Sequence, residues 1–208
     1  MLARPGIERI EDLRGKSVAA SSPGTPPDMV ARAALVQAKV PPAEVKIAAV
    51  GGDRDRFTAL LGGVVDAAVV SNEYLPLPSV KSLRVLVEAR QVLPQFLRFC
   101  TLVTGKTLND RREDLVRFMT AQIKAVRYAV THRDETIALT REAIGAKPDD
   151  PRPAFVYEEG LKPGVVDADF SIPLESLVWS QDQMIALGQL ARGGDINKLI
   201  YPDIRKEA

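Results

Sequence analysis

The sequence predicts an α/β protein built on a mostly parallel sheet with helices on both faces. In about the first 70 residues, apolar runs that suit strands alternate with segments that suit helices, in the order strand, helix, strand, helix, strand. These strands are almost continuously apolar, as they are in parallel sheets that helices cover on both sides. From about Leu108 onward, helical spacing dominates. We therefore expect an α/β domain over residues 1–104 and a helical C-terminal region over residues 105–208.

Local signals place the elements of the first part. Strands are expected over residues 15–21, 45–50, 64–70 and 83–87, and helices over residues 29–38 and 53–61. Thr25 or Asp28 can cap the first helix, which Pro41 and Pro42 prevent from continuing. Gly62-Gly63 closes the second helix, because glycine readily adopts the left-handed conformation that ends helices.

The second part is expected to be helical, with a break between Pro148 and Pro153. Apolar residues recur at helical spacing from Asp110 to His132, and a further helix follows that ends at Gly145. Two more helices are expected over residues 154–160 and 174–190. No internal repeat or low-complexity tract is visible.

Composition excludes several classes of protein. The chain has 208 residues, of which 46% are hydrophobic, and its formal net charge of +1 gives no electrostatic reason to expect nucleic acid as a partner. No membrane insertion is expected, because the longest apolar stretch, residues 59–70, is far shorter than the roughly 20 residues of a spanning helix. One cysteine and one histidine leave no multi-cysteine or multi-histidine metal centre, and we expect no cofactor.

The residues offer no catalytic constellation, so no enzyme activity is expected. Cys100 lies in a strand-like apolar run, where a thiol is expected to be a buried small hydrophobe. His132 follows a long helix, where a histidine most often caps the helix or faces solvent. Gly51-Gly52 lacks the spacing of a dinucleotide or phosphate-binding loop.

A candidate binding loop follows the first strand. Residues 21–25 lie at the expected carboxyl end of a strand and open a helix, a place where backbone N–H groups and the helix dipole favour anions. We expect Ser22 and Thr25 to donate hydroxyls to a ligand, and Gly24 and Thr25 to donate backbone N–H groups. The alternative is that Ser22 and Thr25 only cap the helix.

A second loop occupies the equivalent place after the third strand. It contains Ser71, Asn72 and Tyr74, and the tyrosine is expected to form a stacking wall for the ligand. Ligands of open α/β sheets bind beyond the carboxyl ends of the strands. The two loops are therefore expected to converge on one ligand-binding cleft.

The order of residues resembles the second lobe of periplasmic substrate-binding proteins of ABC importers, in the nitrate/sulfonate/taurine and thiamine-precursor (NMT1-like) group. The resemblance begins with IEDLRGKSVAASSPGT at residues 10–25 and continues with PPAEVKI at residues 41–47. Its most specific piece is RFTALLGGVVDAAV at residues 56–69. Residues 115–125 and 132–135 resemble later helices of these proteins. None of these segments identifies a ligand.

The resemblance implies one lobe of a type II periplasmic-binding fold, followed by helices that complete the other lobe in full-length relatives. It implies binding of a small polar or anionic organic molecule, delivery to an ABC permease and a periplasmic location. No signal peptide precedes the match, so a cytoplasmic location is the other expectation. Related enzymes of thiamine-precursor synthesis resemble this group but use a cysteine-rich motif, which this sequence lacks.

The segment that precedes the match in relatives is absent from this sequence, which leads to a different expectation. The C-terminal helices would then carry apolar side chains with no sheet of their own to cover. We therefore expect a homo-oligomer. The alternative function is a truncated, non-transporting interaction protein, or a remnant of a clamshell binding protein.

Overall fold

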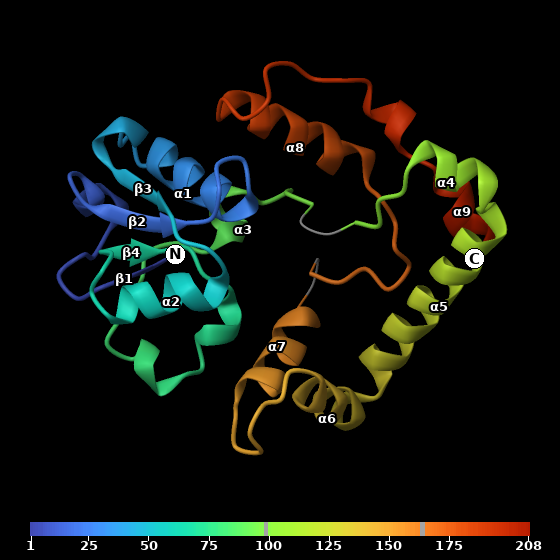
Figure 1. Ribbon diagram of the computed structural model, residues 1–208, viewed down its shortest axis with the longest axis horizontal. Coiled ribbons are helices and arrows are strands. Elements are labelled where there is room, and N and C mark those ends of the chain that lie inside the picture. Colours follow the sequence, from blue (N-terminus) through green and yellow to red (C-terminus); the bar gives the residue numbers. More distant parts are fainter. Residues whose placement is uncertain (98–99, 163–164) are drawn as a thin grey trace. The chain divides into compact units, whose positions relative to one another are not determined.

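The computed structural model describes residues 1–97, 100–162 and 165–208 (Figure 1). The chain forms two compact units. The first comprises Met1–Arg98 and Glu175–Gly194, and the second comprises Phe99–Leu174 and Asp195–Ala208. This division differs from the expected split after residue 104, because the chain returns to the first unit at residue 175.

The first unit is built on a five-stranded sheet with the order β3-β2-β4-β1-β5. The strands are β1 (Leu2–Ala3), β2 (Ser17–Ala20), β3 (Lys46–Ala49), β4 (Ala67–Ala68) and β5 (Arg84–Val85). β2 pairs in parallel with β3 and β4, as expected. β1 was not expected; it lies between β4 and β5 and is antiparallel to both. The sheet is therefore mixed, with a parallel part that carries β2, β3 and β4.

Helices cover both faces of this sheet. Figure 1 shows α1 (Pro26–Gln37) and α2 (Asp53–Leu61) on opposite faces. α2 has the expected bounds, and Gly63 follows it with a φ of +71°, as a glycine that ends a helix does. The unit also contains α3 (Ala89–Val92), α8 (Leu174–Ala186) and four short 3₁₀ helices, at Ile10–Leu13, Pro42–Glu44, Asn72–Tyr74 and Pro78–Val80.

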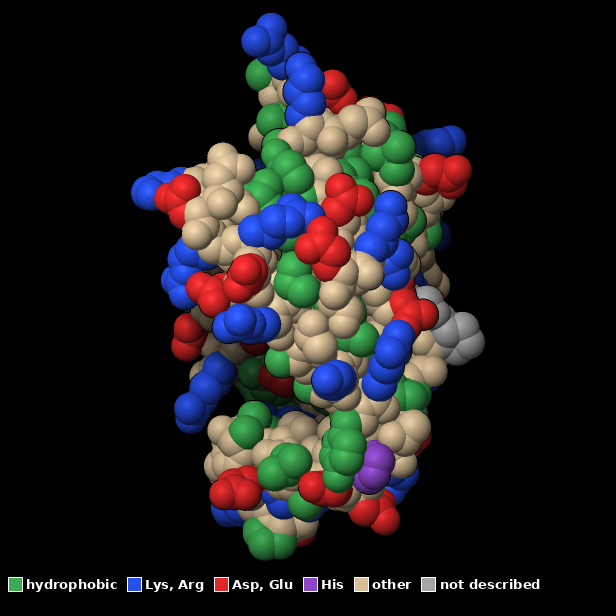
Figure 2. Space-filling view, turned by 90° about the vertical axis from the view of Figure 1, so that its right-hand side faces the viewer, with side chains coloured by type: hydrophobic (Ala, Val, Ile, Leu, Met, Phe, Trp, Pro, Cys, Tyr) green, Lys and Arg blue, Asp and Glu red, His purple; other side chains and the backbone are tan. Residues whose placement is uncertain are grey.

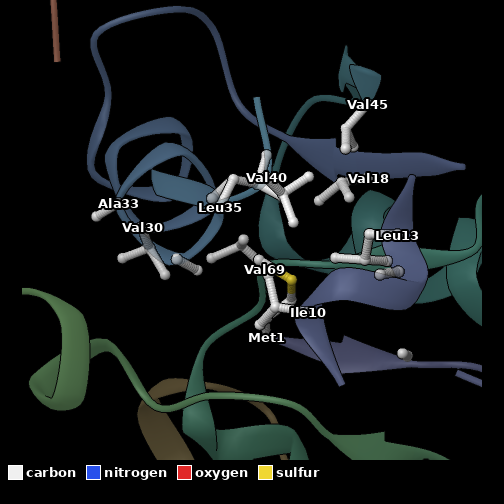
Figure 3. Packing of buried hydrophobic residues seen from close by; sticks show 14 of the residues in the cluster. Met1, Ile10, Leu13, Val18, Val30, Ala33, Leu35, Val40, Val45 and Val69 are labelled. Atoms are coloured by element: carbon white, nitrogen blue, oxygen red, sulfur yellow. The ribbon is translucent and has the colours of Figure 1, made fainter. Parts of the chain in front are cut away.

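Alternate residues of β1, β2 and β4 contribute to two separate hydrophobic clusters. Val18 points into the cluster that contains α1, whereas its neighbour Ala19 points into the cluster that contains Phe57 and Leu60 of α2. Figure 3 shows the α1 cluster, in which Leu35 and Val40 pack near Val18, Leu13 and Val45. The sheet therefore lies between two apolar layers.

The C-terminal helix α8 contributes to the first of these clusters. Trp179, Met184 and Leu187 pack against it. Part of the apolar face that was expected to have no sheet to cover therefore packs on the core of the first unit. Leu174, Val178 and Ile185 of the same helix stay exposed.

The second unit is helical, as expected. It contains α4 (Gly105–Asp110), α5 (Arg112–Thr131), α6 (Arg133–Ala143), α7 (Arg152–Gly160), a 3₁₀ helix (Ile196–Leu199) and α9 (Pro202–Glu207). An ion pair between Arg112 and Glu207 joins α5 to α9, and Arg133 Nε donates to Glu158 Oε1 at 2.7 Å to join α6 to α7. On the face drawn in Figure 2, Lys and Arg side chains are interspersed with Asp and Glu, and hydrophobic side chains lie exposed between them.

Cys100 and His132, the two residues considered as possible catalytic groups, both lie in the second unit. Cys100 is exposed and lies outside any strand, so the expected buried position was wrong. His132 ends α5, its Nδ1 lies 2.9 Å from the carbonyl oxygen of Tyr128, and its ring stacks on the Tyr128 ring. The capping interpretation of His132 is confirmed. In the described part of the chain, no helix is long and apolar enough to cross a membrane.

Candidate binding edge

The parallel pairing places the carboxyl ends of β2, β3 and β4 at one edge of the sheet. Three loops leave the sheet there: residues 21–25 after β2, Gly51-Gly52 after β3, and residues 71–74 beyond β4. We call this surface the carboxyl edge. It contains every residue that the sequence predicted for binding.

One buried arginine joins the ends of the three strands. Arg56, on α2, is only 2% exposed, and its Nε donates to the carbonyl of Val69 at 2.7 Å. Its Nη1 donates to the carbonyl of Gly51 at 2.6 Å and lies 3.4 Å from the hydroxyl of Ser21. Because Ser21, Gly51 and Val69 follow three different strands, this guanidinium fixes the three strand ends relative to one another.

The carboxylate of Asp53 extends this network to the third loop. Its Oδ1 accepts from Arg56 Nη2 at 2.7 Å and from the backbone N–H of Ser71 at 2.8 Å. Asp53 is the first residue of α2, where a negative charge is favoured by the helix dipole. Asp55 accepts from the backbone N–H of Gly52 at 3.0 Å and so closes the turn before the helix.

The loop after β2 uses several of its own donors internally. The Thr25 hydroxyl donates to the carbonyl of Ser22 at 2.6 Å, and the Thr25 N–H donates to the same oxygen at 3.2 Å. The Gly24 N–H donates to Asp28 Oδ2 at 3.0 Å. Gly24 has a φ of +81°, which other residues rarely adopt. The three groups of Gly24 and Thr25 that were expected to bind a ligand are therefore occupied within the loop.

Asp28 anchors this loop from the first turn of α1. It is 1% exposed, and both of its oxygens lie 3.0 Å from Nε of Arg32. Gln189, beyond α8, donates its Nε2 to Asp28 Oδ2 at 2.8 Å. A buried carboxylate is stable only when hydrogen bonds or a counter-charge compensate for lost water, and Asp28 has both.

The predicted residues differ in how far they reach the surface. Ser22, Gly24 and Asn72 are exposed, and Thr25 and Ser71 are half-buried. Tyr74 is only 7% exposed, in the hydrophobic cluster beneath α2, and its ring centre lies 4.4 Å from that of Phe57. This position does not favour the expected stacking wall for a ligand, because the tyrosine ring fills the core under its loop.

Asp66 lies at the opposite end of the sheet and has a structural role, as expected. Its Oδ2 accepts from the backbone N–H of Ser17 at 2.9 Å and from the Ser17 hydroxyl at 2.8 Å. These hydrogen bonds, the backbone bond above all, hold the pKa of the Asp66 carboxyl below its ordinary value. Asp66 thus fixes the start of β4 against the start of β2.

Sequence reasoning alone missed Arg56 and Asp28 as organisers of the edge. Arg56 begins the segment that carries the most specific resemblance, at residues 56–69, but a lone arginine on an amphipathic helix normally indicates a solvated charge. Asp28 was considered only as a helix cap. Its partner Gln189 lies 161 residues away, so no local pattern could have connected them.

The comparison with sequence families now decides the relationship. The profile of the family described as NMT1/THI5 like matches residues 1–136, which include the whole carboxyl edge. The chain belongs to this family. A search of curated proteins finds no match to the chain.

Solved structures show the same fold. The periplasmic aliphatic sulphonate binding protein SsuA from Escherichia coli is similar, with a TM-score of 0.70 at 18% identity over 96% of this chain. The alkanesulfonate-binding protein SsuA from Xanthomonas axonopodis pv. citri, bound to MOPS, gives a TM-score of 0.68 at 14% identity over 91% of this chain. The match covers 64% of each of those two chains, so this chain spans less than two thirds of their length. The similarity identifies the fold as that of periplasmic binding proteins.

Proposed function

We propose that this chain is the solute-binding component of an ABC-type importer, and that it binds a small polar or anionic organic molecule at the carboxyl edge. The observation that carries the proposal is the Arg56 network, which brings three loops together at the place where α/β proteins bind ligands. Membership of the NMT1/THI5-like family and the likeness to sulfonate-binding proteins support it.

The exposed polar groups of the edge support a polar or anionic ligand. The Ser22 hydroxyl and the Asn72 amide are exposed on two of the three loops. The nine-residue helix α2 begins at the same edge, but the carboxylates of Asp53 and Asp55 already lie at the positive end of its dipole, so these two loop groups are the donors offered to a ligand. A ligand with a compact anionic or polar head, such as a sulfonate, suits these donors.

The proposed role includes a permease partner and a periplasmic location. It includes no reaction on the solute, because the edge presents hydrogen-bonding groups without a nucleophile and base in contact. The test is calorimetric titration of the purified chain with MOPS and with short aliphatic sulfonates, together with native mass spectrometry of the gently purified protein. Saturable binding or a co-purified small molecule supports the proposal. A protein that carries no small molecule and gives no binding heat with these anions opposes it.

A second candidate function is self-association as an interaction protein. The described residues of the helical unit leave large apolar side chains in water, including Leu102 at 84% and Leu199 at 73% exposure. Large apolar side chains in water favour association between copies of a chain when they gather in one patch. Light scattering at micromolar concentration tests this: a defined homo-oligomer is expected, and a well-folded monomer would count against it.

A further inference from the structure

The residues after α8 are held in a fixed conformation beside the carboxyl edge. Gly188 follows the helix with a φ of +71°, and its N–H donates to the carbonyl of Ile185 at 2.9 Å. The Gln189 N–H donates to the carbonyl of Met184 at 2.8 Å. This pair of bonds is the Schellman arrangement, which satisfies the last carbonyls of a helix and fixes the next residue. Gln189 therefore has a well-defined backbone position.

The side chain of Gln189 is oriented by charge. Its Nε2 donates to Asp28 Oδ2 at 2.8 Å, and only this end of the amide can face a carboxylate, since the amide oxygen would be repelled. Oδ2 is the same oxygen that accepts from the Gly24 N–H. Gln189 thus acts on the loop through the one atom that holds Gly24.

The other end of this amide is poorly satisfied. Gln189 Oε1 is buried and has no hydrogen-bond partner among the described residues. A buried acceptor without a partner costs free energy, which offsets much of what the bond to Asp28 contributes. A methionine of similar size would remove both the hydrogen bond to Asp28 and the cost of the unpaired oxygen. The stability of the whole fold therefore gives little reason for a glutamine here.

We propose that Gln189 is a positioning residue for the loop at residues 22–25, which it orders through the carboxylate of Asp28. The inference deepens the proposed function, because that loop is part of the binding edge. The residues after α8 thereby set the geometry of a loop 161 positions earlier in the chain. Arg32 holds the Asp28 carboxylate in place, while Gln189 adds the donor that comes from a different segment.

Amide hydrogen exchange of the free, full-length chain tests the proposal without any ligand. The variant is Gln189→Met, and the matched control is Gln183→Met on α8, whose side chain makes none of the hydrogen bonds found among the described residues. In Gln189→Met the Gly24 and Thr25 amides should exchange about tenfold faster, with a melting temperature within about 2 °C of the parent. Gln183→Met should leave both amides unchanged.

Two results would overturn the proposal. One is unchanged exchange at Gly24 and Thr25 in Gln189→Met. The other is loss of protection throughout the first unit, with the melting temperature falling in Gln189→Met and in Gln189→Glu alike, which would make Gln189 a purely structural residue. Binding of MOPS is measured separately: if the parent does not bind it, the proposed ligand site is at fault, and the exchange data still decide the role of Gln189.

Discussion

Arg56 Nε donates to the carbonyl of Val69 at 2.7 Å, and this bond links the helix on one face of the sheet to the end of β4. Nη1 of the same guanidinium reaches the residues after β2 and β3, and Nη2 donates to Asp53. The side chain of Arg56 therefore holds the ends of three strands together at the carboxyl edge.

Replacing Arg56 should be strongly destabilising. Arg56→Met removes one donor from the Asp53 carboxylate and one from each of two backbone carbonyls, and we expect a loss of about 3 kcal/mol in the free energy of unfolding. Arg54→Met, at an exposed position of the same helix, should change it by less than about 0.5 kcal/mol. Urea unfolding of both variants gives the comparison, and equal effects would contradict the role assigned to Arg56.

Removing the hydroxyls of the first loop should weaken a bound solute. In the double variant Ser22→Ala/Thr25→Ala, the exposed hydroxyl is lost, and so is the bond from Thr25 that shapes the loop. We expect the binding free energy of an anionic ligand to fall by about 1–3 kcal/mol in calorimetry. Ser82→Ala, at an exposed position of the same unit, is the control. An unchanged affinity in the double variant would remove this loop from the site.

Tyr74 should behave as a core residue. Tyr74→Ala removes a ring that packs on Phe57, and we expect the free energy of unfolding to fall by about 3 kcal/mol. Tyr201→Ala, at an exposed position, should have little effect. Differential scanning calorimetry of the two variants tests the assignment. A stable Tyr74→Ala protein with weaker ligand binding would contradict it and support a role of Tyr74 in stacking on the ligand.

Acid should weaken the contact between Asp66 and Ser17. The pKa of Asp66 is lower in the folded chain than in the unfolded one, so its contribution to stability is present above the unfolded value of about 3.9. That contribution is lost as the pH falls through the folded value. The stability difference between the parent and Asp66→Asn should therefore be largest near pH 7 and shrink toward pH 3 in urea unfolding. A difference that does not vary with pH would contradict the assignment.

The order of strands and helices was predictable because its signals are local. The end of α2 follows from the two glycines after it, Gly62 and Gly63. β1 escaped prediction because it is only two residues long, and its pairing with Ala68 and Val85 depends on contacts distant in sequence. The same distance explains why residues 175–194 could not be placed with the first unit.

The candidate edge was predictable in its place but not in its construction. A loop after a buried strand indicates where a ligand can lie, and the exposed Ser22 and Asn72 agree with this. The sequence could not show which donors the loops use themselves. Asp28 takes the Gly24 amide, and the tyrosine expected at the surface fills a gap in the core.

Backbone NMR titration of the full-length chain with MOPS tests the central claim most directly, because it shows both whether an anion binds and where. We expect saturable shifts of amides in residues 21–25, 51–54 and 71–74, with the helices of the second unit unaffected. Shifts centred elsewhere, or none at millimolar MOPS and other small sulfonates, would contradict the claim that the carboxyl edge is a solute-binding site.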